Sequence, residues 1–190
     1  MENGTQIKVW DPVVRTFHWV LVASFLVAFI TEDDFLTLHS WAGYTVGIAL
    51  LVRLVWGFIG PPHARFSDFV TSPTAAFRYA KDALMMRARR YIGHNPAGGL
   101  MIIAMMVSLL ITTFTGIALY GAAEQAGPMA STFATTGAFW EEALEEVHEF
   151  FANFTLFLVV IHVGGVIWES LIHKENLVTS MINGLKRVNE

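Results

Sequence analysis

Four apolar stretches, each long enough to cross a lipid bilayer, constrain this chain more than any other feature. A transmembrane helix needs about 20 consecutive apolar residues, and the stretches cover 13–30, 38–59, 98–120 and 147–172. The chain is 54% hydrophobic and only 15% charged, whereas soluble domains are about 25% charged. The sequence therefore predicts a single all-α domain over residues 1–190, a membrane-embedded four-helix bundle.

The basic residues predict the orientation of the helices. All twelve Lys and Arg lie on one side of the proposed membrane, and the connections on the other side contain none. Because cytoplasmic connections are enriched in Lys and Arg, both termini are expected in the cytoplasm. The opposite connections carry nine acids: Glu32, Asp33, Asp34, Glu124, Glu141, Glu142, Glu145, Glu146 and Glu149.

Several helix starts are marked by a polar residue followed by proline. This pattern is typical of an N-cap with proline at the first helical position. The pair Ser72-Pro73 opens the segment 74–91, between the second and third spans. We interpret this segment as an amphipathic helix on the membrane surface. A plain basic loop is the alternative. The three pairs are Asp11-Pro12, Ser72-Pro73 and Asn95-Pro96.

Four histidines fall inside the spans, where an ionisable side chain indicates function by default. His148 and His162 are fourteen residues apart on the last span, which separates them by about 21 Å and turns them in nearly the same direction. His18 in the first span matches the depth of His162, and His39 in the second matches that of His148. Two facing pairs at two depths, on neighbouring helices of a bundle, favour bis-histidine haem ligation.

Other interpretations of these histidines remain open. A single intramembrane histidine can hydrogen-bond a helix backbone or hold two helices together. A zinc site would need more ligands, typically four. The chain contains no cysteine, which excludes iron–sulfur ligation, disulfides and covalent haem attachment.

Arginines and glycines near the histidines suggest further contacts with a haem. Arg15 and Arg53 lie at the inner level, where either suits a haem propionate; the alternative is a snorkelling anchor. Glycine permits close approach of a flat macrocycle, although ordinary helix packing uses small residues too. The candidate glycines are Gly43, Gly47 and Gly116.

Three histidines lie outside the spans, on the side expected to face the cytoplasm. They are His63, His94 and His173. We expect them to be solvated or to bind lipid headgroups. The alternative is that His63 or His94 helps to carry protons to a quinone at the inner haem.

Several motifs together resemble the bacterial cytochrome b561 superfamily, in particular the branch containing the b-type cytochrome subunit of nickel–iron hydrogenases. The resemblance spans nearly the whole chain and includes the two histidines of the last span. The other motifs are Trp10-Asp-Pro-Val-Val-Arg-Thr-Phe-His-Trp19, Leu38-His-Ser-Trp-Ala-Gly43, Arg53-Leu-Val-Trp-Gly-Phe-Ile-Gly60, His63-Ala-Arg-Phe66, Gly93-His-Asn-Pro-Ala-Gly98 and Thr115-Gly116.

The resemblance implies four core helices, two b haems and electron transfer between a quinone pool and a partner, in the cytoplasmic (inner) membrane of a bacterium. Residue matching carries the ligand roles to His18 and His162 for the inner haem and to His39 and His148 for the outer haem. The outer acids favour a cationic periplasmic partner, such as a c-type cytochrome, or a hydrogenase-like enzyme, and no nucleic acid is expected. Alternatives are a superoxide:quinone oxidoreductase on the same scaffold and a haem-free transporter of metal or protons.

Overall fold

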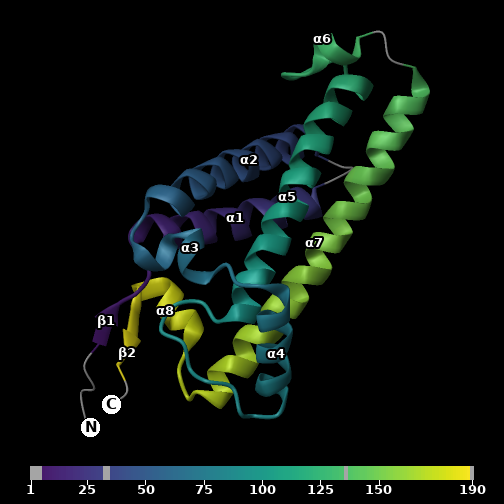
Figure 1. The fold of residues 1–190 in the computed structure, drawn as a ribbon. Coiled ribbons are helices and arrows are strands. Elements are labelled where there is room, and N and C mark those ends of the chain that lie inside the picture. The colour runs from purple at the N-terminus through teal and green to yellow at the C-terminus, as the bar shows by residue number, and fades with distance from the viewer. Residues whose placement is uncertain (1–5, 32–34, 135–136, 189–190) are drawn as a thin grey trace. The chain divides into compact units, whose positions relative to one another are not determined.

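Four long helices dominate the computed structural model, which describes residues 6–31, 35–134 and 137–188 (Figure 1). Each of the four is long and apolar enough to cross a membrane, which confirms the predicted all-α class and the four spans. Their bounds are α1 Pro12–Ile30, α2 Leu36–Ile59, α5 Pro96–Ala123 and α7 Ala138–Ile172.

Short elements connect and flank the long helices. A 3-10 turn η1 and the helices α3 and α4 follow α2, the helix α6 follows α5, and the helix α8 follows α7. Two short strands lie near the ends of the chain. Their bounds are η1 Pro62–Ala64, α3 Phe66–Phe69, α4 Pro73–Leu84, α6 Ala130–Phe133, α8 Leu177–Asn183, β1 Gln6–Lys8 and β2 Leu185–Arg187.

The three predicted N-caps are confirmed. The Asp11 carboxylate accepts from the backbone N–H of Val13 at 2.9 Å and begins α1. Ser72 Oγ accepts from Ala75 N at 3.2 Å and begins α4. Asn95 Oδ1 accepts from Gly98 N at 2.7 Å and begins α5. Each side chain satisfies a backbone donor that the first helical turn leaves unpaired.

Two boundaries differ from the sequence prediction. The last long helix, α7, begins at Ala138 rather than at residue 147, because the Glu- and Ala-rich segment before the apolar stretch has high helix propensity. In contrast, α4 ends at Leu84 rather than at residue 91, and Met86 follows in a left-handed conformation with φ 57°. An amphipathic helix between the second and third spans is confirmed, but it is shorter than expected.

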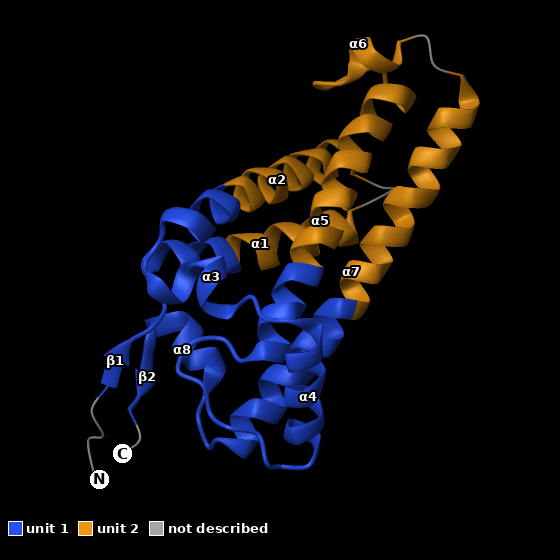
Figure 2. Cartoon of the chain, in the orientation of Figure 1, with its two compact units in different colours: residues 1–18, 52–104, 158–190 blue, residues 19–51, 105–157 orange. Residues whose placement is uncertain are grey.

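The described chain divides into two compact units (Figure 2). Unit 1 consists of residues 1–18, 52–104 and 158–190, and unit 2 of residues 19–51 and 105–157. All twelve Lys and Arg belong to unit 1, and the nine acids of the opposite connections belong to unit 2. Of the nine acids, Glu32, Asp33 and Asp34 lie outside the described residues. The separation of basic from acidic residues in the sequence therefore coincides with the division of the chain into two units.

Unit 1 contains a feature that the sequence prediction missed, an antiparallel ladder between β1 and β2 (Figure 1). Ile7 pairs with Lys186 in its register. The chain then enters a small core of Val9, Trp10, Val14 and Ala64. Segments from the two ends of the chain thus lie side by side at the start of α1.

Unit 2 contains a polar contact between two of its apolar helices. Ser108 on α5 and Thr155 on α7 share a hydrogen bond of 2.7 Å between their hydroxyls, and each residue is 1% exposed. Ser108 Oγ also lies 3.3 Å from the Phe151 carbonyl. Buried hydroxyls need such partners, particularly in an apolar environment.

Candidate functional site

Two of the predicted site histidines come together in unit 2. His39 lies near the start of α2 and His148 lies in α7, and both are half-buried. Their ring centroids are 6.0 Å apart and the ring planes make an angle of 71°. Sequence matching by depth therefore paired two side chains that are neighbours in the folded chain.

The backbone fixes the tautomer of both rings. Nδ1 of His39 donates to the Ala28 carbonyl at 2.9 Å, and Nδ1 of His148 donates to the Thr112 carbonyl at 2.9 Å. The Thr115 hydroxyl is a weaker neighbour of His148 Nδ1, at 3.4 Å. Because a carbonyl only accepts, Nδ1 carries the proton in both rings, and Nε2 is left with a lone pair that can bind a metal.

The three candidate glycines differ in what surrounds them. A Cβ at Gly116 would come within 2.7 Å of His148 Cε1, so the imidazole sits directly against the α5 backbone. A Cβ at Gly47 would meet the Thr113 methyl at 3.1 Å, as in close packing of two helices, whereas a Cβ at Gly43 would meet nothing within 4 Å. Of the three, only Gly116 is required by the position of a histidine.

His18 and His162 belong to unit 1. They lie on α1 and α7, each half-buried, and near enough for their charges to interact. The second predicted pair therefore also combines residues of a single unit, and each unit contains one pair.

Arg53 is buried in unit 1, with 3% of its surface exposed. One guanidinium nitrogen donates to the Ala64 carbonyl at 2.9 Å. The guanidinium carbon lies 4.9 Å from the ring centre of Phe66 and 5.7 Å from that of Phe69. This burial differs from that of a snorkelling anchor, whose charged end reaches water.

The second candidate arginine, Arg15, lies in the first turns of α1. It donates to the Ile182 carbonyl in α8. Its Nε is buried and has no hydrogen-bond partner among the described residues.

The three histidines outside the spans are more enclosed than expected. The ring of His94 packs against Trp10 and Phe69, with centroid distances of 4.5 and 4.6 Å. His173 pairs with Glu169 at 3.2 Å, and its side chain is 13% exposed. The prediction of solvated rings is therefore wrong for His94 and His173. The side chain of His63 is 33% exposed and lies 3.2 Å from Asp68, so it is the most solvated of the three.

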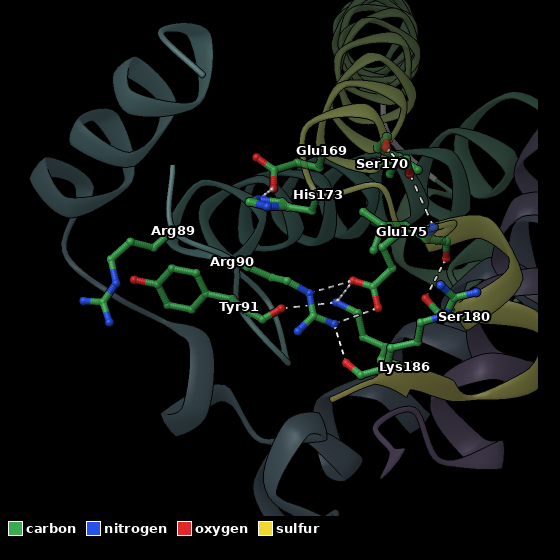
Figure 3. Close-up of polar contacts among 12 residues, drawn as sticks. Arg89, Arg90, Tyr91, Glu169, Ser170, His173, Glu175, Ser180 and Lys186 are labelled. Carbon is green, nitrogen blue, oxygen red and sulfur yellow. Dashed lines mark hydrogen bonds and ion pairs between the residues drawn. The ribbon is translucent and has the colours of Figure 1, made fainter. Parts of the chain in front are cut away.

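A buried ionic cluster in unit 1 joins the end of the chain to the segment after α4 (Figure 3). Glu175 contacts Arg90 at 3.0 Å and Lys186 at 3.4 Å, and Lys186 also donates to the Tyr91 carbonyl at 3.2 Å. Burial disfavours the Glu175 carboxylate, but the Arg90 hydrogen bond and the two cations outweigh this effect and lower its pKa. Burial lowers the pKa of the Lys186 ammonium, against the opposing effect of Glu175.

A second polar contact ties α4 to α7. The Tyr79 hydroxyl lies 3.0 Å from Glu169 Oε2, and the indole of Trp168 donates to the Ala83 carbonyl at 3.0 Å. Burial, together with the charge of Glu169, raises the pKa of Tyr79. The sequence prediction used Lys186 and the nearby basic residues only to orient the chain in the membrane. Nothing in the local pattern shows that a lysine near the end of the chain is buried.

Four helices apolar enough to cross a membrane, with two pairs of neighbouring histidines, indicate an integral membrane protein. The family model for prokaryotic cytochrome b561 matches residues 9–184. The chain belongs to this family of membrane b-type cytochromes, and membership implies b-type haem and electron transport.

The curated relatives carry a common name. The chain is 25% identical to a probable Ni/Fe-hydrogenase B-type cytochrome subunit of Rhizobium leguminosarum bv. viciae, over 94% of this chain and 87% of the relative. It is 27% identical to the protein of that name from Azotobacter vinelandii, over 97% and 90%. The protein of that name from Rhodobacter capsulatus is 24% identical, over 97% and 82%. No solved structure matches the chain significantly.

Proposed function

We propose that the chain carries electrons across the cytoplasmic membrane of a bacterium through two b haems, each bound between two histidines. His39 and His148 hold one haem, and His18 and His162 hold the other. The geometry of His39 and His148 supports this proposal most strongly.

The separation of these two rings fits a metal between them. Two imidazoles that bind one metal through Nε2, with bonds of about 2 Å as in zinc sites, have ring centres about 6 Å apart, and the observed distance is 6.0 Å. Ligating histidines almost always donate their other N–H to a carbonyl or carboxylate, and both Nδ1 atoms here donate to a backbone carbonyl.

Several other observations favour haem over a bare metal ion. Within 6–31, 35–134 and 137–188, no group of three or more His, Cys, Asp or Glu side chains could hold a metal ion, and a structural zinc site needs four ligands. Gly116 leaves room for the His148 ring. We assign Arg53 and Arg15 to the propionates of the inner haem. We assign Gly43 and Gly47 to the surface that contacts the outer haem.

Haem iron supplies one-electron redox chemistry when bound, with a potential set by axial ligands, hydrogen bonds and burial. The chain supplies the axial ligands, the hydrogen bonds and the burial that set this potential. The carbonyls of Ala28 and Thr112 hold the two imidazoles in one tautomer. A hydrogen bond from Nδ1 raises the basicity of the ligating nitrogen, and this favours the oxidised state of the bound metal.

We propose that a membrane quinone exchanges electrons with one haem. A periplasmic redox partner exchanges electrons with the other haem. The six described acids of unit 2 are exposed and none forms an ion pair, which supports a cationic partner such as a c-type cytochrome. The names of the relatives support a hydrogenase-like enzyme. Docking by charge should weaken as salt increases.

The haem assignment is tested by spectra of the purified protein. We expect two b haems per chain, and one in each of the single variants His148→Ala and His162→Ala. His63→Ala is the matched control, because His63 is partly exposed and pairs with Asp68, and this variant should keep both haems. A ratio of one in the wild-type protein, or two haems in either variant, contradicts the assignment. Addition of a quinol should then reduce the bound haem, and absence of that reduction contradicts quinone use.

A further inference from the structure

The ring of His94 is held in one orientation but leaves a polar atom unused. Trp10 and Phe69 pack against it, with ring centroids 4.5 and 4.6 Å away. Its Nδ1 is buried and has no hydrogen-bond partner among the described residues. Buried polar atoms in folded proteins nearly always have a partner, and an exception calls for one that is not part of the chain.

The surroundings of His94 are basic. Burial, together with the nearby groups Arg53, Lys186, His63 and His162, lowers the pKa of its imidazole to about 3. The ring is therefore neutral near pH 7 and carries one N–H. No acid is among the groups that influence it, so the local field favours an anion.

Arg53 lies near the same aromatic residue, Phe69, and its charge acts on His94. It is buried, and its hydrogen bond to the Ala64 carbonyl uses one of its five N–H donors. The carboxylate of Asp11 is near enough for its charge to act on Arg53, but its hydrogen bonds go to other groups. Asp11 caps α1 and accepts from the Trp56 indole, and Glu175 pairs with Arg90 and Lys186. A buried guanidinium needs a compensating anion.

We propose that His94 and Arg53 together form a carboxylate-binding site, and that its occupant is a propionate of the haem held by His18 and His162. This inference rests on the proposed function and adds His94, which lies outside the spans, to the residues that bind the cofactor. Arg53 supplies the charge, and the N–H at Nδ1 supplies a directed hydrogen bond. Trp10 and Phe69 keep that N–H aimed at the carboxylate.

The site predicts a specific effect of His94 on the inner haem. In His94→Leu, the carboxylate loses a hydrogen bond and its negative charge is less compensated, so adding an electron to the inner haem becomes less favourable. We expect a lower midpoint potential for the inner haem and a shift of its propionate bending band in resonance Raman spectra. The outer haem should keep its potential and serve as the test of correct folding. His94→Asn retains an N–H close to the position of Nδ1 and should keep the wild-type band.

Reconstitution with haem labelled with ¹³C at the propionate carboxyls identifies the occupant. The Raman band that responds to His94→Leu should shift in frequency when the propionates carry the label. If that band does not shift with the label, the carboxylate belongs to another molecule and the proposal is overturned. The proposal also fails if neither variant changes the band, or if Leu and Asn change it equally, which would indicate packing alone. A wild-type protein with fewer than two haems instead refutes the proposed function.

Discussion

Replacing Gly116 with alanine should selectively disrupt the outer haem, which we propose His39 and His148 hold. The added Cβ would lie 2.7 Å from His148 Cε1 and 3.0 Å from its Nδ1, whereas an ordinary contact begins at 3.4 Å. The ring must therefore move by about 0.7 Å. A metal site tolerates errors of only about 0.2 Å in its bond lengths, and the displacement also strains the bond from Nδ1 to the Thr112 carbonyl.

The cost can be expressed as a loss of haem affinity. Overpacking of this kind costs about 1–3 kcal/mol, which corresponds to about 5- to 150-fold weaker binding. Titration of purified Gly116→Ala with haem, followed by reduced-minus-oxidised spectra, measures the effect. Gly164→Ala is the control, because a Cβ there meets nothing within 4 Å of the chain. An outer haem with unchanged affinity and potential in Gly116→Ala would refute the placement of His148 as its ligand.

Three further predictions concern the scaffold. Glu175→Gln leaves the buried Lys186 and the half-buried Arg90 without a carboxylate partner and should lower the free energy of unfolding by about 3 kcal/mol. Because the pKa of Glu175 is depressed below 4.5, thermal melts should show this contribution above about pH 4.5 and its loss as acid protonates the native carboxylate. Ser108→Ala with Thr155→Val should cost less together than the sum of the single changes, in a double-mutant cycle measured by denaturation, because each single change leaves one buried hydroxyl unpaired. Since the chain has no cysteine, Glu142→Cys and Arg87→Cys should react with an impermeant thiol reagent from opposite sides of the membrane; labelling from one side contradicts the predicted orientation.

The sequence alone predicted the features that depend on local chemistry. Apolar length located the four long helices, and the pairs Asp11-Pro12 and Asn95-Pro96 located the starts of two of them. Depth along a helix follows from residue count, so the sequence alone is enough to match His39 with His148. These predictions needed no knowledge of which surfaces touch.

Features that depend on tertiary contact were missed. The start of α7 was placed too late because hydropathy marks where a membrane core begins, and a helix can extend beyond it into a charged segment. The pairing of β1 with β2 joins residues that are almost the whole chain apart. Likewise, His94 reads as a loop residue in sequence, and its enclosure depends on Trp10, a residue far away along the chain.

The discontinuous make-up of the two units has a consequence for biogenesis. Unit 2 ends at residue 157, whereas unit 1 requires β2, at Leu185–Arg187. Proteins are synthesised from the N-terminus, so every residue that shapes the cradle of His39 and His148 leaves the ribosome before the strand that completes the other unit. Synthesis therefore has a built-in order, in which all of unit 2 is made while unit 1 still lacks its last strand.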